Sequence, residues 1–340
     1  MRQRYSRQIF FPPVGQAGQE RIRRSSVLVV GAGALGSVLA NNMARAGVGR
    51  LRIVDRDFVE ESNLQRQILY DEEDAAQTLP KAVAAVEKLR KINSEVDYEP
   101  VVADVNSTNV EELLTGFDLV LDGADNFEVR MLINDACVKH GVPWIHGACV
   151  GSQGLSFDVL PGETPCFRCI YQDSPPPGST PTCDTAGVIA PIVNIIASIQ
   201  SAEALKLLVG DQEHLSRDLV SVDVWENSFE RIDLSNARRP ECPACGERRF
   251  EFLEAKRGWL SMSLCGRDAI QVAPPPGGKV DLVEVAQRLS RLGEVSRNPF
   301  LLRFQADGRE MVLFGDGRAV IKGTNDEAAA RSFYAKYVGM

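Results

Sequence analysis

Short apolar runs alternate with segments of helical periodicity along the first half of the chain. Residues 27–33, VLVVGAG, predict a buried strand and a turn, and residues 35–47, LGSVLANNMARAG, predict a helix that ends at Gly47. The pattern continues with strands at 51–55, near 97–103, at 118–125 and at 142–150, and helices at 81–92 and near 127–140. Because strands that alternate with helices form parallel sheets covered on both faces, the pattern predicts a Rossmann-like, doubly wound α/β sheet.

The pattern changes after the last of these strands. Residues 155–160, LSFDVL, alternate as a half-buried strand does, and residues 221–234 predict two antiparallel strands. The Pro-, Gly-, Ser- and Thr-rich segment 173–183 predicts irregular structure, followed by an apolar helix from about 187 to 209. This helix contains polar side chains and a proline, so we interpret it as a buried helix and not a membrane span. The expected sheet is therefore mostly parallel, with antiparallel strands added.

The C-terminal part of the chain has a different pattern, in which short β-like runs follow one another without helices between them. Asp307-Gly308 and Asp316-Gly317 separate three β-like runs into two predicted hairpins. The runs are 300–306, 309–314 and 318–322, and helices are predicted at 281–292 and 325–338. We therefore expect a first domain at 1–249 and a small α+β domain at 250–340.

Composition and charge narrow the class of protein. A chain of 340 residues favours about two domains, and 44% apolar with 25% charged residues is typical of a globular protein. With 46 acidic and 38 basic residues the net charge is −8, which disfavours nucleic acid and anionic membranes as partners. The N-terminal MRQRYSRQIF lacks the apolar core of a signal peptide, so we expect a cytoplasmic protein. Its eight cysteines then point to metal binding or catalysis before disulfides.

A glycine-rich turn follows the first predicted strand. Gly31, Gly33 and Gly36 form GAGALG at the start of the predicted helix, where backbone N–H groups can bind a phosphate. Asp55 ends the next strand, where an acid that binds a ribose is expected. These residues predict a nucleotide site, and on their own would favour a dinucleotide-dependent dehydrogenase.

The residues after Asp55 favour a triphosphate instead. Asn63, Arg66 and Gln67 come in quick succession, and Lys81 follows in PKA. Cations beside a triphosphate under attack neutralise the charge that builds on the leaving pyrophosphate, whereas they have no evident role in hydride transfer. In a second group, Asp125 and Asn126 of DGADN lie at the carboxyl end of a strand, where a carboxylate can hold Mg²⁺ on the phosphates.

Two C-x-x-C pairs point to a metal. The pairs are Cys166 with Cys169 and Cys242 with Cys245. Four thiolates complete a tetrahedral Zn²⁺ site without an open position, which predicts a structural zinc that ties the second segment back to the sheet. A single pair could instead be a redox site, but two pairs in one reduced chain favour zinc.

Taken together, these motifs resemble the bacterial relatives of ubiquitin-activating enzymes, the ThiF/MoeB/HesA family. The resemblance covers roughly residues 1–248 and rests on RYSRQ at 4–8, GAGALG, SNLQRQ, PKA, DGADN and the cysteine pairs. Family members bind ATP and adenylate the C-terminal glycine carboxylate of a small ubiquitin-like protein. The stretches LCGRDAIQV and FGDGRAVIKGT resemble the longer, thiazole-biosynthesis members of the group.

The resemblance implies roles for individual residues. Asp55 would contact the ribose, Asn63, Arg66 and Lys81 would line the triphosphate, and Asp125 would coordinate Mg²⁺. Arg7 matches an arginine that reaches into the site of the partner protomer, which implies a homodimer.

The resemblance also singles out Cys183. It stands in the C-x-x-A-G context of the family's nucleophilic cysteine, before the apolar helix, and a helix N-terminus lowers the pKa of a thiol. The alternative is an exposed loop thiol. Cys137 and Cys149 are expected in the core, Cys265 is not assigned to sulfur transfer, and the three histidines, His140, His146 and His214, are interpreted as structural or solvated.

The expected function is ATP-dependent adenylation of a ubiquitin-like sulfur carrier, first a ThiS-like carrier of thiamine synthesis. A MoaD-like carrier of molybdopterin synthesis would undergo the same chemistry, and the C-terminal domain could help to hold either. An NAD-dependent oxidoreductase, a non-catalytic zinc-bound scaffold and a tRNA-modifying dehydratase are the alternatives. An oxidoreductase would have no use for Arg7, Arg66 and Lys81, and a scaffold would not need the full set of nucleotide residues. A tRNA-modifying dehydratase would favour a basic surface, whereas this chain is acidic.

Overall fold

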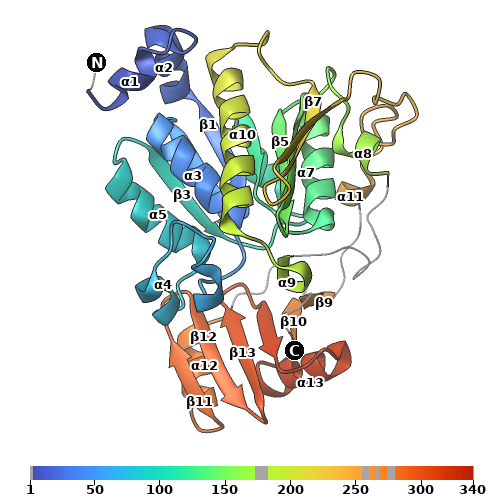
Figure 1. The fold of residues 1–340 in the computed structure, drawn as a ribbon. Helices are drawn as coiled ribbons and strands as arrows, with labels where there is room; N and C mark the ends of the chain where they lie inside the picture. The colour runs from blue at the N-terminus through green and yellow to red at the C-terminus, as the bar shows by residue number, and fades with distance from the viewer. Residues whose placement is uncertain (1–2, 173–182, 255–259, 265–267, 274–279, 340) are drawn as a thin grey trace. The chain divides into compact units, whose positions relative to one another are not determined.

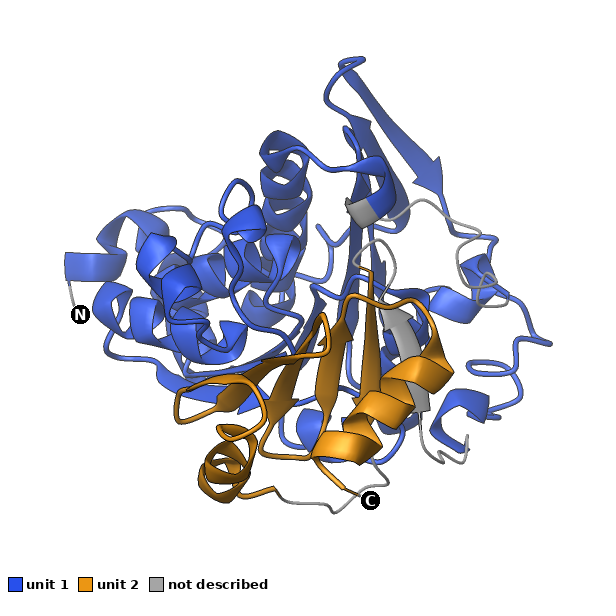
Figure 2. Cartoon of the chain, turned by 90° about the horizontal axis from the view of Figure 1, so that it is seen from below, with its two compact units in different colours: residues 1–255 blue, residues 256–340 orange. Residues whose placement is uncertain are grey.

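The computed structural model describes residues 3–172, 183–254, 260–264, 268–273 and 280–339. Contacts divide the chain into two compact units, Met1–Ala255 and Lys256–Met340 (Figure 2). Each unit has its own sheet and its own core, and each is described by itself.

The first unit is built on an eight-stranded sheet with the order β3-β2-β1-β4-β5-β6-β7-β8. The strands are β1 (Ser26–Val30), β2 (Arg50–Asp55), β3 (Asp97–Val102), β4 (Leu119–Asp122), β5 (Trp144–Val150), β6 (Gln153–Val159), β7 (Asp218–Asp223) and β8 (Ser228–Asp233). The first five run parallel, and β6 to β8 are antiparallel, which confirms the predicted fold class. Val30 pairs with Val54 and Asp122, so β1, β2 and β4 end at the same edge.

Helices cover both faces of this sheet (Figure 1). The long helices are α2 (Gly15–Arg24), α3 (Ala34–Ala46), α5 (Lys81–Ile92), α7 (Phe127–His140) and α10 (Ala190–Val209). The short helices are η1 (Gln3–Tyr5), α1 (Ser6–Ile9), η2 (Glu61–Asn63), α4 (Glu72–Ala76), α6 (Val110–Leu114), α8 (Phe167–Ile170), α9 (Cys183–Ala186) and α11 (Glu251–Glu254). Val27 and Val29 of β1 pack in one core with α2, α3, α5 and α10, whereas Leu28 and Val30 pack in a second core with α6 and α7. The central strands are therefore apolar on both faces, which explains their unbroken hydrophobic runs.

The N-terminal segment packs at the edge of the sheet opposite to the strand carboxyl ends. A Cβ on Gly47, which ends α3, would lie 2.5 Å from the Tyr5 ring. The side-chain amide of Asn93, just after α5, donates to the Tyr5 hydroxyl (2.9 Å). Helices α1 and α2 were not predicted from the sequence.

Strand β6 differs from its prediction. Its alternation predicts an exposed Ser156 and Asp158, yet these side chains are 2% and 4% exposed. The reason is α10, which covers this face: a Cβ on Gly154 would lie 2.4 Å from Cγ1 of Ile196. The hydroxyl of Ser156 is satisfied by donating to the carbonyl of His146 (2.8 Å).

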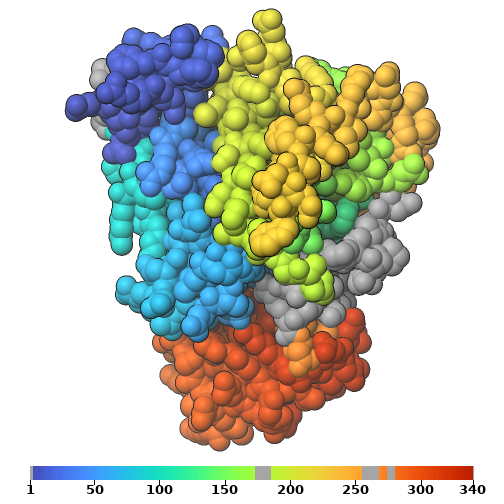
Figure 3. Space-filling view, viewed as in Figure 1, coloured from blue at the N-terminus to red at the C-terminus, as the bar shows by residue number. Residues whose placement is uncertain are grey.

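Helix α10 begins three residues later than predicted, because Gly187 has φ +74° and a proline occupies its first turn. Among the described residues it is the one helix that passes a length and hydropathy test for a membrane span, with mean hydropathy 1.5 and half of that stretch buried. Ile192, Val193 and Ile196 pack in the core, and the outward face lies at the surface (Figure 3). We interpret α10 as a core helix of the sheet.

The second unit holds a six-stranded antiparallel sheet with the order β11-β12-β13-β14-β10-β9. The strands are β9 (Leu260–Leu264), β10 (Ala269–Ala273), β11 (Glu294–Arg297), β12 (Leu301–Ala306), β13 (Arg309–Phe314) and β14 (Ala319–Lys322). Helices α12 (Leu282–Leu289) and α13 (Glu327–Tyr337) pack on one face in a core with Phe304, Leu313 and Ile321. The two predicted hairpins are confirmed, whereas β9, β10 and β11 were not predicted.

Candidate functional site

The turn after β1 lies in close backbone contact with the loop after β4. Gly31 has φ +88°, and a Cβ there would lie 2.4 Å from the carbonyl oxygen of Gly123 after β4. A Cβ on Gly36 would lie 1.8 Å from the Gly31 carbonyl oxygen. Gly33, which precedes α3, is different: among the described residues other than its chain neighbours, the one atom within 4 Å of its Cβ position is Nε2 of Gln67, at 4.0 Å. The turn is therefore packed at Gly31 and Gly36 and open at Gly33, where the N-terminus of α3 attracts an anion.

Asp55 ties this turn to β2. Its Oδ2 accepts the N–H of Ala32 (2.6 Å), and its Oδ1 accepts the N–H of Asp57 (2.6 Å). Burial raises the pKa of Asp55, against the opposing charge of Lys81. Each carboxylate oxygen has two acceptor positions, so Asp55 can still accept a hydrogen bond from a ligand hydroxyl. Tyr70, which sequence reasoning missed, donates its hydroxyl to the Ala32 carbonyl (2.7 Å).

Lys81 is held at the same edge by acidic neighbours. It is the first residue of α5, its side chain is buried, and its Nζ lies 3.4 Å from Oδ2 of Asp57. Arg56 lies beside it, with Nη1 3.2 Å from Oδ1 of Asp104. A buried ammonium needs such a carboxylate partner, so Asp57 fixes the position of the Lys81 charge. Neither Arg56 nor Asp57 was assigned a role from the sequence.

Asp125 and Asn126 lie in the loop between β4 and α7. Asn126 caps α7 by accepting the N–H of Val129 (2.9 Å), and its amide donates to Oδ1 of Asp125 (2.9 Å). Desolvation raises the pKa of Asp125, but the charge of Arg56, the hydrogen bond from Asn126 and the charge of Lys81 together hold it below its ordinary value. Asp125 is thus an exposed, ionised carboxylate at neutral pH, which is the ligand type that Mg²⁺ prefers.

A buried network that the sequence did not indicate holds this loop. Asp122, at the end of β4, accepts the N–H of Ala124 (2.8 Å), Nε of Arg130 (3.0 Å) and Nδ1 of His146 (2.7 Å). Arg130 also donates Nη2 to the Ala124 carbonyl (2.7 Å). Desolvation raises the pKa of Asp122, but the charge of Arg130 and the hydrogen bond from His146 outweigh this effect. The net pKa is therefore lowered and the carboxylate stays ionised. His146 is structural, as expected.

The SNLQRQ segment contains one side chain that holds the local fold, Asn63, and one whose charge can contact a ligand, Arg66. Asn63 is buried, and its Oδ1 accepts the N–H of Glu60 (3.2 Å) in a cap of η2. Arg66 donates Nη1 to the carbonyl of Ser62 (2.9 Å) and has no acidic partner within the described part of the chain. Its positive charge is therefore available to an anionic ligand.

The structure does not bring Arg7 to the other predicted nucleotide residues at the carboxyl ends of β1, β2 and β4. Arg7 lies in α1, with its guanidinium 5.8 Å from the ring centre of Phe10, and its side chain is exposed. Gln8 beside it donates to the carbonyl of Ala46, the last residue of α3. Helix α3 begins at the glycine turn and is about 20 Å long at 1.5 Å per residue, so Arg7 lies at the other end of that helix.

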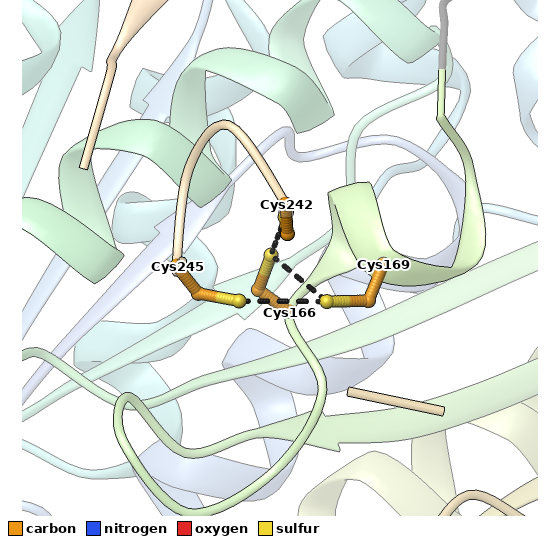
Figure 4. A group of neighbouring side chains, drawn as sticks. All are labelled: Cys166, Cys169, Cys242 and Cys245. Atoms are coloured by element: carbon orange, nitrogen blue, oxygen red, sulfur yellow. Dashed lines mark hydrogen bonds between the residues drawn. The ribbon is translucent and has the colours of Figure 1, made fainter. Parts of the chain in front are cut away.

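The four cysteines of the C-x-x-C pairs form a compact cluster (Figure 4). Sγ of Cys166 lies 3.6 Å from Sγ of Cys242 and 3.9 Å from Sγ of Cys169, and Sγ of Cys169 lies 3.4 Å from Sγ of Cys245. Zn–S bonds of about 2.3 Å in a tetrahedron place the sulfur atoms about 3.8 Å apart. All four Sγ atoms lie within 4.8 Å of one another, so the donor set fits Zn²⁺ with four protein ligands.

Local backbone contacts position the two halves of the cluster. Cys166 precedes α8, and its carbonyl accepts the N–H of Cys169 (2.9 Å). In the second pair, the N–H of Gly246 donates to the Cys242 carbonyl (2.9 Å), and a Cβ on Gly246 would lie 2.0 Å from the Pro240 carbonyl oxygen. The cysteines therefore come together through two tight turns, one from each side of the long segment between them.

Cys183 lies outside the residues whose side chains are described. Its backbone begins α9, and the segment after it is anchored at Gly187, whose carbonyl accepts the N–H of Gly151 at the end of β5 (2.8 Å). Cys265 also lies outside the described residues. Cys137 is buried and Cys149 is half-buried.

The chain is similar to known proteins in sequence and in fold. The model of the ThiF family matches residues 5–244. A Bacillus subtilis protein named sulfur carrier protein ThiS adenylyltransferase is 45% identical over 337 residues, 99% of each chain. A Thermus thermophilus sulfur carrier protein adenylyltransferase is 42% identical over 249 residues, 72% of this chain and 90% of the relative. The crystal structure of E. coli MccB with ATP has a TM-score of 0.62 at 24% identity, over 72% of this chain and 74% of that chain, and supports the fold.

Proposed function

Because this chain belongs to the ThiF family, we propose that it adenylates the C-terminal carboxylate of a ubiquitin-like, ThiS-like sulfur carrier with ATP. The observation that carries the proposal is the open N-terminus of α3 at Gly33, together with Arg66, whose charge has no acidic partner among the described residues. The relative named as a ThiS adenylyltransferase matches over nearly the whole of both chains, including the second unit. The acyl-adenylate would then accept sulfur as a thiocarboxylate for thiazole synthesis.

The reaction needs charge neutralisation more than proton transfer. One oxygen of the carrier carboxylate forms a bond to the α-phosphorus, and the bond from that phosphorus to the bridging oxygen breaks, so that pyrophosphate leaves. The nucleophile is already ionised and needs no general base. Arg66, Lys81 and the N–H groups at the start of α3 offset the repulsion between the two anions and stabilise the leaving group.

Other residues at this edge bind the nucleotide. Asp55 accepts a hydrogen bond from the ribose, Gly33 allows the phosphates to approach the backbone, and Gly31 and Gly36 keep the turn tight. The remaining members of the proposed site are Asn63, Asp125 and Asn126. Asp125 would hold Mg²⁺, which supplies positive charge to the phosphate oxygens when bound.

The four-cysteine cluster would hold a structural Zn²⁺. Four thiolate ligands leave no coordination position for a substrate, so the metal supplies stability and takes no part in the chemistry. It would tie the segment around Cys242 to the turn that precedes α8. The six described cysteines are free of disulfides, in keeping with the reduced, cytoplasmic setting that we propose.

We propose that the active form is a homodimer. Arg7 would then reach the nucleotide of the partner protomer, since it lies far from the site of its own chain. Phe10 and Phe11 beside it are 69% and 59% exposed, an apolar surface that a second copy can cover. Cys183 would take part in transfer of the activated carrier, and the second unit would help to hold the carrier.

ATP–pyrophosphate exchange tests the proposed function and the identity of the carrier together. Purified ThiS-like and MoaD-like carriers are each compared with a form that lacks the terminal glycine. We expect exchange that depends on Mg²⁺ and on the terminal glycine of the ThiS-like carrier. Exchange with the MoaD-like carrier alone would show that the substrate is MoaD-like and not ThiS-like. No exchange with either carrier by a folded, zinc-loaded enzyme would overturn the proposed adenylation.

A further inference from the structure

Two buried carboxyl groups meet between β6 and α10. Asp158 of β6 is 4% exposed, and both oxygens of its side chain are buried without an N–H or hydroxyl donor among the described residues. Glu203 of α10 is 7% exposed and lies in hydrogen-bonding contact with the Asp158 carboxyl group. Asp158 pairs with Ile145, near the start of β5, so the two acids lie toward the amino ends of the parallel strands. They are therefore far from the strand ends that carry the proposed nucleotide site.

The two acids differ in their hydrogen-bond partners. Oε1 of Glu203 accepts a hydrogen bond from Nζ of Lys206 (2.5 Å), and its Oε2 accepts the N–H of Ser216 (3.0 Å). These donors favour the ionised form of Glu203, whereas Asp158 has no such donor. Two buried carboxylates in contact are not both ionised, because burial and like charge disfavour the charged form. The proton is therefore expected on Asp158, whose O–H group can donate to Glu203.

The cations near Asp158 do not remove this repulsion. Lys206 and Arg217 act on it by charge, but each has an acidic partner of its own. Lys206 pairs with Glu203, and Nη2 of Arg217 lies 3.0 Å from Oε2 of Glu163. Burial raises the pKa of Asp158 well above its ordinary value, and the charge and hydrogen bond of Glu203 raise this pKa further.

The neighbouring strands add no compensating charge. The cross-strand partner of Asp158 on β5 is the apolar Ile145. Strand β7 begins at Asp218, whose Oδ2 lies 2.6 Å from Nη2 of Arg231, so the charge of that arginine is already paired. The hydrogen-bonded proton is thus the means by which the two acids remain in contact.

We propose that Asp158 and Glu203 share one proton and form a pH-sensitive contact between β6 and α10. While Asp158 is protonated, it donates to Glu203 and holds the helix against the strand. When Asp158 ionises at higher pH, the two carboxylates repel each other and the docking of α10 weakens. The contact is independent of the proposed adenylation, since neither acid lies at the carboxyl ends of β1, β2 and β4.

The direction of the pH dependence follows from the linkage between proton binding and folding. The folded protein holds the Asp158 proton more tightly than the unfolded chain does. The stabilisation is therefore fully present below the unfolded pKa of about 3.9 and is lost as the pH rises through the folded value.

Asp158→Asn tests the shared proton, because asparagine keeps the size and a donor toward Glu203 but cannot ionise. We measure the unfolding equilibrium constants of the full-length wild type and variant by urea denaturation, between about pH 5 and pH 9. The ratio of the wild-type constant to the variant constant should rise about tenfold per pH unit and level off above the folded pKa of Asp158. A ratio that does not change with pH would overturn the inference.

Infrared difference spectroscopy detects the proton directly. The spectrum of the wild type minus that of Asp158→Asn at neutral pH should contain the C=O band of a protonated carboxyl group, which an aspartate of ordinary pKa does not give. The matched control is Glu213→Gln, an acid-to-amide change at an exposed residue after α10, which should show neither the band nor the pH-dependent ratio. A difference spectrum without the band would contradict the shared proton. An Asp158→Asn variant that fails to fold would contradict it too, since asparagine supplies the same donor to Glu203.

Discussion

The proposed nucleotide site lies at the carboxyl ends of β1, β2 and β4, called the edge below. This edge and the four-cysteine cluster are assembled in opposite ways. At the edge, Arg66 has no acidic partner within the described ranges and Asp125 is exposed, so charged groups remain available to a ligand. In the cluster, the thiol groups already lie in mutual contact, and Cys166 and Cys242 are buried. The edge keeps unsatisfied charges for a ligand that comes and goes, whereas the cluster is shaped for a ligand that stays. Changes at the edge should therefore affect catalysis, and changes in the cluster should affect stability.

The edge nevertheless has a rigid foundation. Lys81 pairs with Asp57, and the loop of Asp125 is held through Asp122 and Arg130. These partners are buried or half-buried, as are Lys81 and Asn63, whereas Asp125 is exposed. Substitutions should therefore distinguish the residues that contact the ligand from the residues that hold them in place.

Arg66→Ala should have the largest effect. Removing one stabilising group for transition-state charge typically costs about 10²–10³-fold in rate, and we expect a loss of that size in ATP–pyrophosphate exchange. The Tm should stay unchanged, because the Arg66 guanidinium makes one hydrogen bond in the described part of the chain, to the Ser62 carbonyl. Arg24→Ala, at an exposed arginine on α2, is the control. Full exchange by Arg66→Ala would mean that this charge does not serve the phosphates.

Cys242→Ser should reverse that pattern. Binding of a structural metal contributes to the free energy of folding, so loss of one thiolate should lower the free energy of unfolding by several kcal/mol. Urea denaturation and zinc analysis of the purified protein measure the two effects. Cys149→Ser, a half-buried cysteine outside the cluster, should keep the zinc. A wild-type protein without zinc, or a Cys242→Ser variant as stable as wild type, would contradict the structural metal.

Asp122→Asn tests the foundation of the edge. It leaves the buried Arg130 without its carboxylate, and breaking a buried ion pair costs about 3–5 kcal/mol in stability. The pKa of Asp122 is lowered in the folded protein, so its contribution is fully present above the unfolded value of about 3.9 and is lost as the pH falls through the folded value. Denaturation at pH 7 should thus show the full difference between variant and wild type. Asp118→Asn, at an exposed carboxylate just before β4, should lower the free energy of unfolding far less. Equal decreases in the two variants would mean that the buried network does not stabilise this loop.

The sequence predicted the elements whose signals are local. The helix over 127–140 matches α7 because Asn126 caps it and Gly141, with φ +71°, ends it, both within a few residues of the helix. The four cysteines were predicted as one site because C-x-x-C spacing is itself a ligand geometry. Local signals of this kind can be read without knowing the tertiary structure.

The parts that the sequence missed depend on contacts between distant segments. Asp122 and His146 are 24 residues apart and meet through the pairing of β4 with β5. Ser156 looked like an exposed position until α10 was placed over its face of the sheet. Gln67 was noted as a member of the SNLQRQ segment, but that its buried Oε1 has no hydrogen-bond partner among the described residues is visible only once the surrounding loops are in place.

The smallest effect is expected in the pH dependence of exchange. The pKa of Asp125 lies below its ordinary value because the charge of Arg56, with the hydrogen bond from Asn126 and the charge of Lys81, outweighs desolvation. Asp125 is therefore ionised at every pH above the ordinary range for aspartate, and its proposed hold on Mg²⁺ should weaken only below that range. Arg56→Gln removes the largest of these lowering charges, so the acid limb of kcat/KM for ATP should move toward neutral pH while the rate at pH 7.5 changes little. Profiles measured at saturating Mg²⁺ should show a smaller shift, since the metal competes with the proton for the same oxygens. Superimposable profiles of variant and wild type would mean that Arg56 serves the fold through Asp104 and not the charge of Asp125.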